Sequence, residues 1–276
     1  MNASARCRLI ALFLLGLPVA ATAAAATGAV INFASLDRNH PFQVAGTLYR
    51  PNSAPAPAVV MVHGTTGIDA RGAYYRDAIL DAGIAVFEVD FKSGIYSGPA
   101  DRPSPDAMLA MGFAALHELR KLSGIDPQRI GVLGFSMGGH LAVGAAFESN
   151  RKQWLGDEKG FAAHVAFYPV CSAFLKRSDL ELTGAPMIIF YGSEDAYGDG
   201  EAVPKFKSLL KQRSRFDLTT IEYAGAAHGF NRNAAPLSYR DPAAIGGRGY
   251  MAWNEPASRD SLGRVVAFLR QSLAAK

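Results

Sequence analysis

Gly134-Phe135-Ser136-Met137-Gly138 sets a serine between two glycines, each two residues away. A largely apolar run at 129–133 precedes this segment and small residues at 139–146 follow it, so we expect a strand before it and a helix after it. A serine at such a corner is a nucleophile elbow, in which the backbone is strained and a side chain at either glycine would clash. The turn should lift the hydroxyl of Ser136 clear of the sheet.

Short β-branched runs alternate with longer amphipathic runs along the rest of the chain. This order predicts an α/β fold, a mostly parallel central sheet with helices on both faces. We expect strands at 30–34, 43–49, 58–62, 84–89, 129–133, 164–168, 186–191 and 218–223, the first two as an antiparallel edge, and helices at 73–82, 106–122, 139–146, 201–212 and 258–273. The long loops at 90–105 and 225–256 are the expected binding elements, because ligands of open parallel sheets lie beyond the carboxyl ends of the strands.

The N-terminus differs in composition from the rest of the 276 residues. Two arginines precede an apolar run at 9–20, and small residues at 21–23 follow it, which is typical of a secretory signal. We therefore expect a signal peptide at 1–23 and a single domain at 24–276, in a periplasmic or secreted protein. The apolar run is too short to cross a bilayer comfortably, so no membrane association is expected after its removal.

The charge and cysteine content exclude several classes of function. Removing Arg6 and Arg8 lowers the formal charge from +4 to +2, with 28 − 2 = 26 basic against 24 acidic residues. This excess is too small and too scattered to indicate nucleic-acid binding. Only Cys171 remains after Cys7 is lost, so no internal disulfide is expected. No metal-ligand or dinucleotide motif occurs, so we expect a reaction without cofactor or metal, and no feature indicates the oligomeric state.

A serine nucleophile needs a base that takes its proton and an acid that holds the base. In a fold with this strand order, the acid follows a late strand and the histidine comes last. Asp195 and His228 occupy these two positions, so the order Ser136, Asp195, His228 predicts a catalytic triad. Another interpretation stays open, in which Asp195 only caps the next helix and the partner of His228 is either Glu194 or Asp199.

The oxyanion formed during attack needs two backbone N–H donors. Met137 supplies the first, because it begins the helix that follows the elbow. The loop at 63–67 supplies the second, and we expect Thr65 to be the donor, with Thr66 as the alternative. A plain glycine turn is the other interpretation of this loop.

Four segments together resemble the dienelactone hydrolase family of the α/β-hydrolase fold, over nearly all of the mature chain. They are Val62-His63-Gly64, Gly134-Phe135-Ser136-Met137-Gly138-Gly139, Tyr191-Gly192-Ser193-Glu194-Asp195 and Ala227-His228-Gly229-Phe230. The resemblance implies a compact hydrolase that acts on small esters or lactones through an acyl-enzyme. The namesake enzymes carry cysteine at the elbow and a glutamate near it, whereas this chain has Ser136 and Gly64-Thr65. These departures favour a general carboxylesterase.

We therefore expect an exported serine hydrolase whose partner is a small-molecule ester or lactone. A serine peptidase acting on short peptides and an inert binding module with the same fold stay open as alternatives. Arg102 is a candidate to pair with a substrate carboxylate. The candidate pocket aromatics are Tyr74, Phe91, Tyr96 and Phe230, and the histidines expected to be structural are His117, His140 and His164.

Overall fold

The computed structural model describes residues 27–39, 41–91, 103–216 and 218–275. The expected signal peptide at 1–23 lies outside these residues, as do Tyr96 and Arg102. No helix among the described residues combines the length and the apolar character that a membrane crossing requires.

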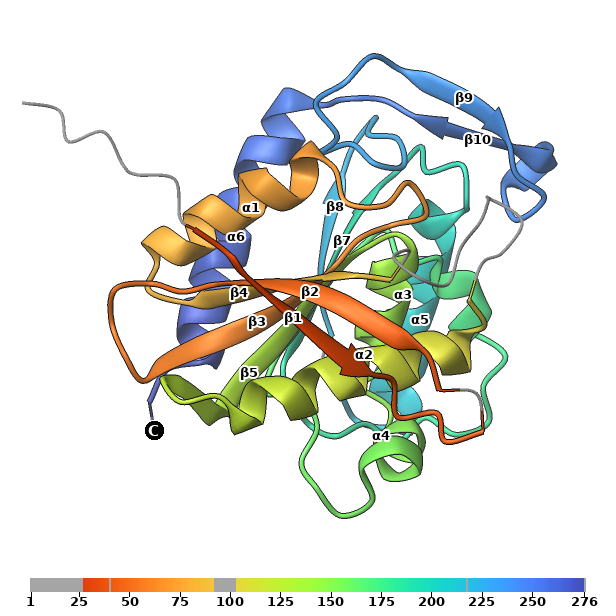
Figure 1. The fold of residues 1–276 in the computed structure, drawn as a ribbon. Coiled ribbons are helices and arrows are strands. Elements are labelled where there is room, and N and C mark those ends of the chain that lie inside the picture. Colours follow the sequence, from red (N-terminus) through yellow and green to blue (C-terminus); the bar gives the residue numbers. More distant parts are fainter. Residues whose placement is uncertain (1–26, 40, 92–102, 217, 276) are drawn as a thin grey trace, which may run out of the picture.

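A mostly parallel sheet forms the centre of the molecule and confirms the predicted α/β architecture (Figure 1). Within the described residues it has eight strands in the order β1-β2-β4-β3-β5-β6-β7-β8. Their bounds are β1 Ala29–Ala34, β2 Gln43–Tyr49, β3 Ala56–Val62, β4 Ala85–Asp90, β5 Ile125–Phe135, β6 His164–Phe167, β7 Met187–Gly192 and β8 Thr219–Tyr223. β2 pairs antiparallel with both β1 and β4, and the strands from β4 to β8 are parallel.

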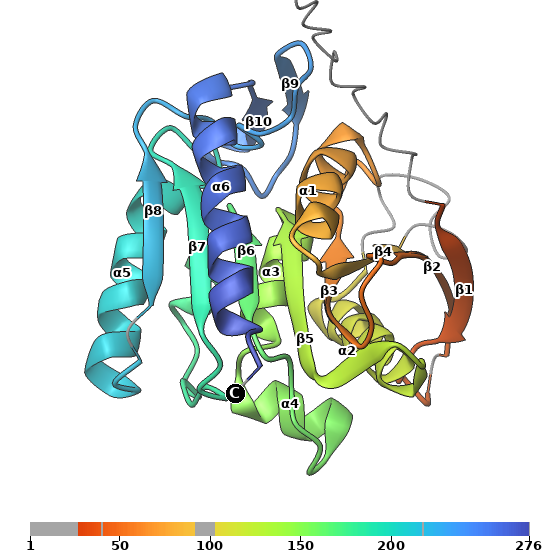
Figure 2. The ribbon, with the colours of Figure 1, turned by 90° about the vertical axis from the view of Figure 1, so that its left-hand side faces the viewer.

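Helices cover both faces of this sheet (Figures 1 and 2). They are α1 Ala70–Asp81, α2 Pro105–Lys121, α3 Met137–Gly144, α4 Glu148–Leu155, α5 Asp199–Arg213 and α6 Glu255–Ser272. Helices α1 and α6 lie on one face, and α2, α3 and α5 lie on the other. Strand β3 is buried on both faces: Val59 packs in the same apolar cluster as Ile79 of α1, and Val60 packs in the cluster that contains Phe113 of α2.

Side-chain caps explain why two helices begin earlier than their apolar periodicity predicts. Helix α1 begins at Ala70 because the carboxylate of Asp69 accepts a hydrogen bond from a backbone N–H of its first turn. Helix α6 begins at Glu255 because the side chain of Asn254 does the same. The prediction placed these starts at 73 and 258, where the apolar pattern becomes regular.

Two short elements lie where the sequence indicated only connections. Helix α4 follows α3, and a hairpin of β9 (Leu237–Arg240) and β10 (Arg248–Met251) occupies part of the predicted loop at 225–256. A parallel bridge joins Met251 to His228, so the end of this hairpin lies beside the loop that carries the histidine. The hairpin therefore forms one wall of the site.

Candidate active site

Ser136 occupies a strained turn between β5 and α3. Its backbone has φ 53° and ψ −112°, a conformation that a residue with a side chain rarely adopts. Two backbone hydrogen bonds hold it there, one from the Ser136 N–H to the carbonyl of Phe167 at 2.9 Å and one from the His140 N–H to the carbonyl of Ser136 at 2.8 Å. The neighbouring strand and the first turn of α3 thus fix the direction of the hydroxyl.

The glycines on either side of Ser136 are required by close backbone contacts. A Cβ atom at Gly134 would lie 2.0 Å from the carbonyl oxygen of Gly138, and one at Gly138 would lie 2.3 Å from the carbonyl oxygen of Val62. Neither contact is sterically possible without moving the backbone. The turn is therefore packed against itself and against the end of β3.

The structure brings together the three residues that the sequence predicted as a triad. Nε2 of His228 lies 2.9 Å from Oγ of Ser136, and Nδ1 of His228 lies 2.8 Å from Oδ2 of Asp195. An ionised carboxylate only accepts hydrogen bonds, so Nδ1 carries the proton and Nε2 is free to accept one from the serine hydroxyl. The other carboxylate oxygen of Asp195 accepts the N–H of Tyr197 at 2.8 Å.

Two aromatic rings hold the imidazole of His228 in place. The ring centroids of Tyr168 and Tyr197 lie 4.5 Å and 4.4 Å from that of His228. Both tyrosines are buried, and so are His228 and Asp195. This packing excludes water from the histidine–carboxylate pair and restricts rotation of the imidazole.

Glu194 and Asp199, the two alternative partners of His228, differ from Asp195 in their surroundings. Glu194 is exposed at the surface. Asp199 is fully buried, but its carboxylate accepts backbone N–H groups from Val170 at 2.9 Å and Cys171 at 2.6 Å. Burial, and then the charge of Asp195, raise the pKa of Asp199 to about 7. Asp195 is therefore the acid that contacts the imidazole.

The loop after β3 passes directly beside the elbow. The position of a Cβ atom on Gly64 lies only 3.3 Å from Cβ of Ser136. Thr65 and Met137 line the same cavity as Ser136, as the predicted oxyanion donors would. The hydroxyl of Thr66 instead bonds to the side chains of Asp69 and Arg71, outside that cavity.

The cavity beside Ser136 has a volume of about 170 Å³ and a mainly apolar lining. Its walls are Thr65, Pro103, Pro105, Met108, Met137, His140, Val170, Tyr197, Asp241 and Ala243. Only part of this lining was predicted. His140, which we expected to be structural, belongs to it, and the position of His140 one helical turn after Ser136 is the signal that could have found it.

Of the aromatic residues proposed for this cavity, the three that the structure describes lie elsewhere. Phe91 and Phe230 are fully buried, and Phe230 packs in an apolar cluster of the core. Tyr74 lies on α1 and is partly exposed. Among the described residues, the tyrosine that lines the cavity is Tyr197, which donates a hydrogen bond to the buried carboxylate of Asp241 at 2.7 Å.

Neither a metal centre nor a thiol nucleophile fits the described part of the chain. In those residues, no three His, Cys, Asp or Glu side chains are grouped so that they could hold a metal ion. Cys171 is fully buried, and burial raises the pKa of its thiol well above the usual value. Burial thus leaves Cys171 poorly placed to act as a nucleophile of this site.

Proteins of known sequence and structure resemble this chain in different degrees. Two uncharacterized proteins of Mycobacterium tuberculosis are each 32% identical to it over 105 residues, and this match covers 37% of the chain and 37% of each relative. The chain therefore aligns with about a third of the length of these curated relatives.

Three solved structures share the fold. A dienelactone hydrolase-like promiscuous phosphotriesterase from metagenomic libraries has a TM-score of 0.65 and 16% identity, covering 90% of this chain and 99% of its own. A thermophilic esterase of Thermogutta terrifontis has a TM-score of 0.63 and 20% identity, covering 91% and 96%. An esterase of Pyrobaculum calidifontis has a TM-score of 0.60 and 18% identity, covering 90% and 86%.

A family profile identifies the chain more directly than these structures do. The profile described as the dienelactone hydrolase family matches residues 44–273, which include the elbow, Asp195 and His228. The matched region extends from β2 to α6 and contains most of the central sheet. The chain thus belongs to the dienelactone hydrolase family, within the α/β-hydrolase superfamily.

Proposed function

We propose that this protein is an exported serine hydrolase that cleaves small carboxylic esters or lactones through an acyl-enzyme. Ser136 is the nucleophile, His228 the general base and Asp195 the residue that orients the base. The observation that carries this proposal is the 2.9 Å separation between Oγ of Ser136 and Nε2 of His228. Membership of a family of ester hydrolases supports the same reaction class.

Acylation begins when Oγ of Ser136 attacks the ester carbonyl. The Oγ–C bond forms as the hydroxyl proton passes to Nε2 of His228, and the carbonyl electron pair moves to the oxygen. The backbone N–H groups of Thr65 and Met137 stabilise this oxyanion. When the intermediate collapses, the C–O bond to the alcohol breaks, and the leaving oxygen takes the proton from Nε2.

Deacylation repeats these steps with water as the nucleophile. Nε2 of His228 accepts a proton from the water as its oxygen attacks the acyl carbonyl, and the same two N–H groups hold the second oxyanion. The bond between Oγ of Ser136 and the acyl carbon then breaks, Oγ takes the proton from Nε2, and the carboxylic acid leaves. Throughout, the carboxylate of Asp195 stabilises the imidazolium that forms transiently.

The cavity beside Ser136 favours short substrates. Its volume of about 170 Å³ is smaller than the roughly 300 Å³ at which pockets for drug-sized ligands begin. The mainly apolar lining gains free energy from burying alkyl groups but has room for few of them. We therefore expect kcat/KM to fall as the acyl chain lengthens.

The place of action follows from the N-terminal pattern. We propose that the signal at 1–23 directs the chain out of the cytoplasm and is then removed, so that the enzyme acts in the periplasm or outside the cell. N-terminal sequencing of the protein recovered from an export-competent host tests this step. An intact N-terminus on protein found only in the cytoplasm would contradict it.

A substrate panel tests the proposed activity. We would compare p-nitrophenyl acetate, butyrate and octanoate with a γ-lactone and a short peptide anilide, using the wild-type protein and Ser136→Ala. The expected result is hydrolysis of the short esters or the lactone, with turnover lower by about 10⁵- to 10⁶-fold in Ser136→Ala. Cleavage of the anilide alone would indicate a peptidase, and no cleavage of any compound would indicate a binding protein.

A further inference from the structure

Arg71 is the second residue of α1, and its side chain is almost completely buried. Nε of its guanidinium donates to the carboxylate of Asp69 at 2.8 Å, and Nη2 donates to Oγ1 of Thr66 at 2.8 Å. Nη1 donates to the hydroxyl of Tyr168 at 3.2 Å. The planar fork thus holds three side chains from two different loops.

Stability alone is a weak explanation for this arrangement. Removing the guanidinium of Arg71 and part of the carboxylate of Asp69 from water opposes folding, and well-packed apolar residues often replace a buried ion pair without loss of stability. Burial opposes the charge of Arg71, yet its contacts with Tyr168 and Asp69 keep its pKa above the ordinary value. The chain thus retains a permanent cation in the interior beside its reactive serine.

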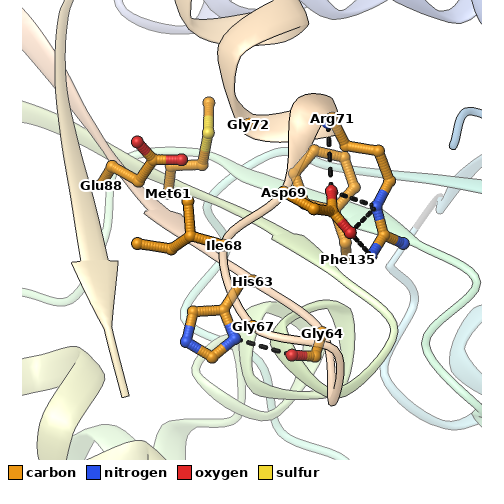
Figure 3. A pocket seen from close by; sticks show the side chains of 10 residues that line it. All are labelled: Met61, His63, Gly64, Gly67, Ile68, Asp69, Arg71, Gly72, Glu88 and Phe135. Carbon is orange, nitrogen blue, oxygen red and sulfur yellow. Dashed lines mark hydrogen bonds and ion pairs between the residues drawn. The ribbon is translucent and has the colours of Figure 1, made fainter. Parts of the chain in front are cut away.

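The space next to this arginine is too small for a substrate. A cavity of about 10 Å³ lies among Arg71, Asp69, Gly64, His63 and Glu88, which is room for about one water molecule (Figure 3). In Figure 3 the guanidinium is turned toward Asp69, to which the dashed lines join it. Arg71 therefore acts on its protein neighbours rather than on a ligand in this cavity.

The first of these neighbours, Thr66, belongs to the loop at 63–67, which we call the oxyanion loop. Thr66 follows Thr65, whose N–H is the proposed second oxyanion donor, and the bond from Nη2 of Arg71 fixes the Thr66 side chain. Oγ1 of Thr66 also donates a hydrogen bond to the carboxylate of Asp69 at 3.2 Å, so the side chains of Thr66, Asp69 and Arg71 are all bonded to one another. The N–H of Thr65 belongs to the peptide between residues 64 and 65, whose carbonyl oxygen accepts the N–H of Gly67 at 3.1 Å. Because Thr66 lies inside this turn, anchoring its side chain restrains the direction of that peptide.

The second neighbour, Tyr168, contacts the segment from His228 to Asn231, which we call the histidine loop. The ring of Tyr168 packs against the imidazole of His228, with 4.5 Å between their centroids. Its hydroxyl accepts a bond from Arg71 and donates one to Oδ1 of Asn231 at 2.5 Å, three residues after the histidine. Asn231 in turn donates to the hydroxyl of Tyr75 on α1 at 3.2 Å.

We propose that Arg71 is a positioning residue that couples the oxyanion loop to the histidine loop through Thr66 and Tyr168. This inference rests on the proposed function. One rigid fork sets the distance between the N–H that stabilises the oxyanion and the imidazole that moves the proton. Both groups act in the transition state, so the coupling supports kcat and leaves ground-state binding largely unchanged.

Kinetics of Arg71→Met and Arg71→Lys test the coupling. A displacement of about 1 Å in a catalytic group costs up to about a hundredfold, so we expect kcat to fall about 10- to 100-fold while KM changes less than about twofold. Affinity for an alkyl boronic acid, which imitates the tetrahedral intermediate, should fall in parallel with kcat. Lysine keeps the charge but not the fork, so Arg71→Lys should remain impaired. Wild-type kcat in either variant would overturn the proposal.

Two milder variants keep the test valid if Arg71→Met does not fold. Thr66→Val and Tyr168→Phe each remove one hydroxyl that Arg71 contacts, and each should lower kcat about 3- to 10-fold. In an Arg71→Lys or Arg71→Met background the same changes should have little further effect, because the contact is already lost. Fully additive effects would show that Arg71 does not link the loops.

Arg129→Met is the matched control. Arg129 is a partly buried arginine on β5, and its Nε pairs with the carboxylate of Asp126 at 2.7 Å. Arg129 precedes Ser136 by seven residues, which is roughly 20 Å along an extended strand. The Arg129→Met substitution should lower thermal stability without changing kcat per active site, with the active sites counted by titration with a fluorophosphonate. An equal loss of kcat in Arg129→Met would reduce the effect at Arg71 to general destabilisation and overturn the proposal. A wild-type protein that neither turns over esters nor takes up the probe would instead refute the proposed function.

Discussion

Asp195 and Asp199 are four residues apart and both buried, yet their carboxylates have different partners. Asp195 accepts from Nδ1 of His228 and from the N–H of Tyr197. Asp199 accepts two N–H groups from the turn that follows β6 and holds Val170, whose φ of 57° is unusual for a β-branched residue. One carboxylate therefore contacts the imidazole of His228, and the other fixes the turn whose Val170 lines the cavity.

Amide substitutions at these two positions should separate their roles. We expect Asp195→Asn to lower kcat by about 10⁴-fold, because an amide cannot hold the imidazole in the required tautomer. Asp199→Asn keeps one acceptor oxygen for the turn and should lower kcat far less. Steady-state kinetics on a short ester, with active-site titration, compares the two. A larger loss in Asp199→Asn would contradict the assignment of Asp195.

The free energy of unfolding should depend on pH because the pKa of Asp199 is raised in the folded protein. Its pKa is about 7 in the folded protein against a usual value of 3.8, so between these values the folded state retains a proton that the unfolded state releases. The contribution of Asp199 to the free energy of unfolding is therefore present below about pH 4 and is lost as the pH rises through about 7.

Urea unfolding from pH 4 to pH 8 measures this effect. The difference in unfolding free energy between the wild type and Asp199→Asn should shift in favour of the variant as the pH rises. Asp195, His228 and Cys171 lie around the same carboxylate in both proteins, so the comparison removes most of their contribution. A difference that is independent of pH would contradict the raised pKa.

Alanine substitutions at two glycines should have opposite effects on stability. Gly134→Ala would place Cβ 2.0 Å from a carbonyl oxygen of the elbow, so we expect loss of activity and destabilisation of several kcal/mol. Gly263, inside α6, has no atom within 4 Å of the added Cβ, so Gly263→Ala should stabilise the protein by about 0.5–1 kcal/mol. Thermal unfolding and ester kinetics check both. Full activity in Gly134→Ala would refute the steric account.

The thiol of Cys171 should be inert in the folded protein. It is fully buried, and its pKa is raised by burial and then by the nearby carboxylates of Asp199 and Asp195, so little thiolate forms. Iodoacetamide should leave ester hydrolysis unchanged and should alkylate Cys171 only after unfolding in urea. Inactivation of the native enzyme by iodoacetamide would indicate a thiol that takes part in the reaction.

Strong periodicity made most of the sheet predictable. The run at 58–62 is apolar on both faces and lies in β3, and the edge strands at 30–34 and 43–49 pair antiparallel as expected. Helix α4 and the β9–β10 hairpin were missed. The hairpin strands have four residues each, and β9 is largely exposed. The two buried positions of β10 are Gly249 and Met251, so no run of β-branched or large apolar residues marks either strand.

The three residues of the predicted triad were identifiable because each follows a strand at the same edge of a parallel sheet. The order of the strands then brings Ser136 and His228, 92 residues apart, into contact. The role of Arg71 had no such signal, because its partners Thr66 and Tyr168 come from separate segments and meet only in the folded chain. Tyr197 likewise became a candidate pocket residue only in the folded chain, whereas the position of His140 one helical turn after Ser136 could have indicated it.

Labelling with a fluorophosphonate probe, followed by mass spectrometry of the peptides, tests most directly whether His228 activates Ser136. We predict one adduct per chain on Ser136, no adduct in Ser136→Ala, and labelling slower by at least about a hundredfold in a folded His228→Ala variant. An adduct on another residue would contradict the account. So would a folded wild-type protein that takes up no probe, or an unchanged labelling rate in His228→Ala.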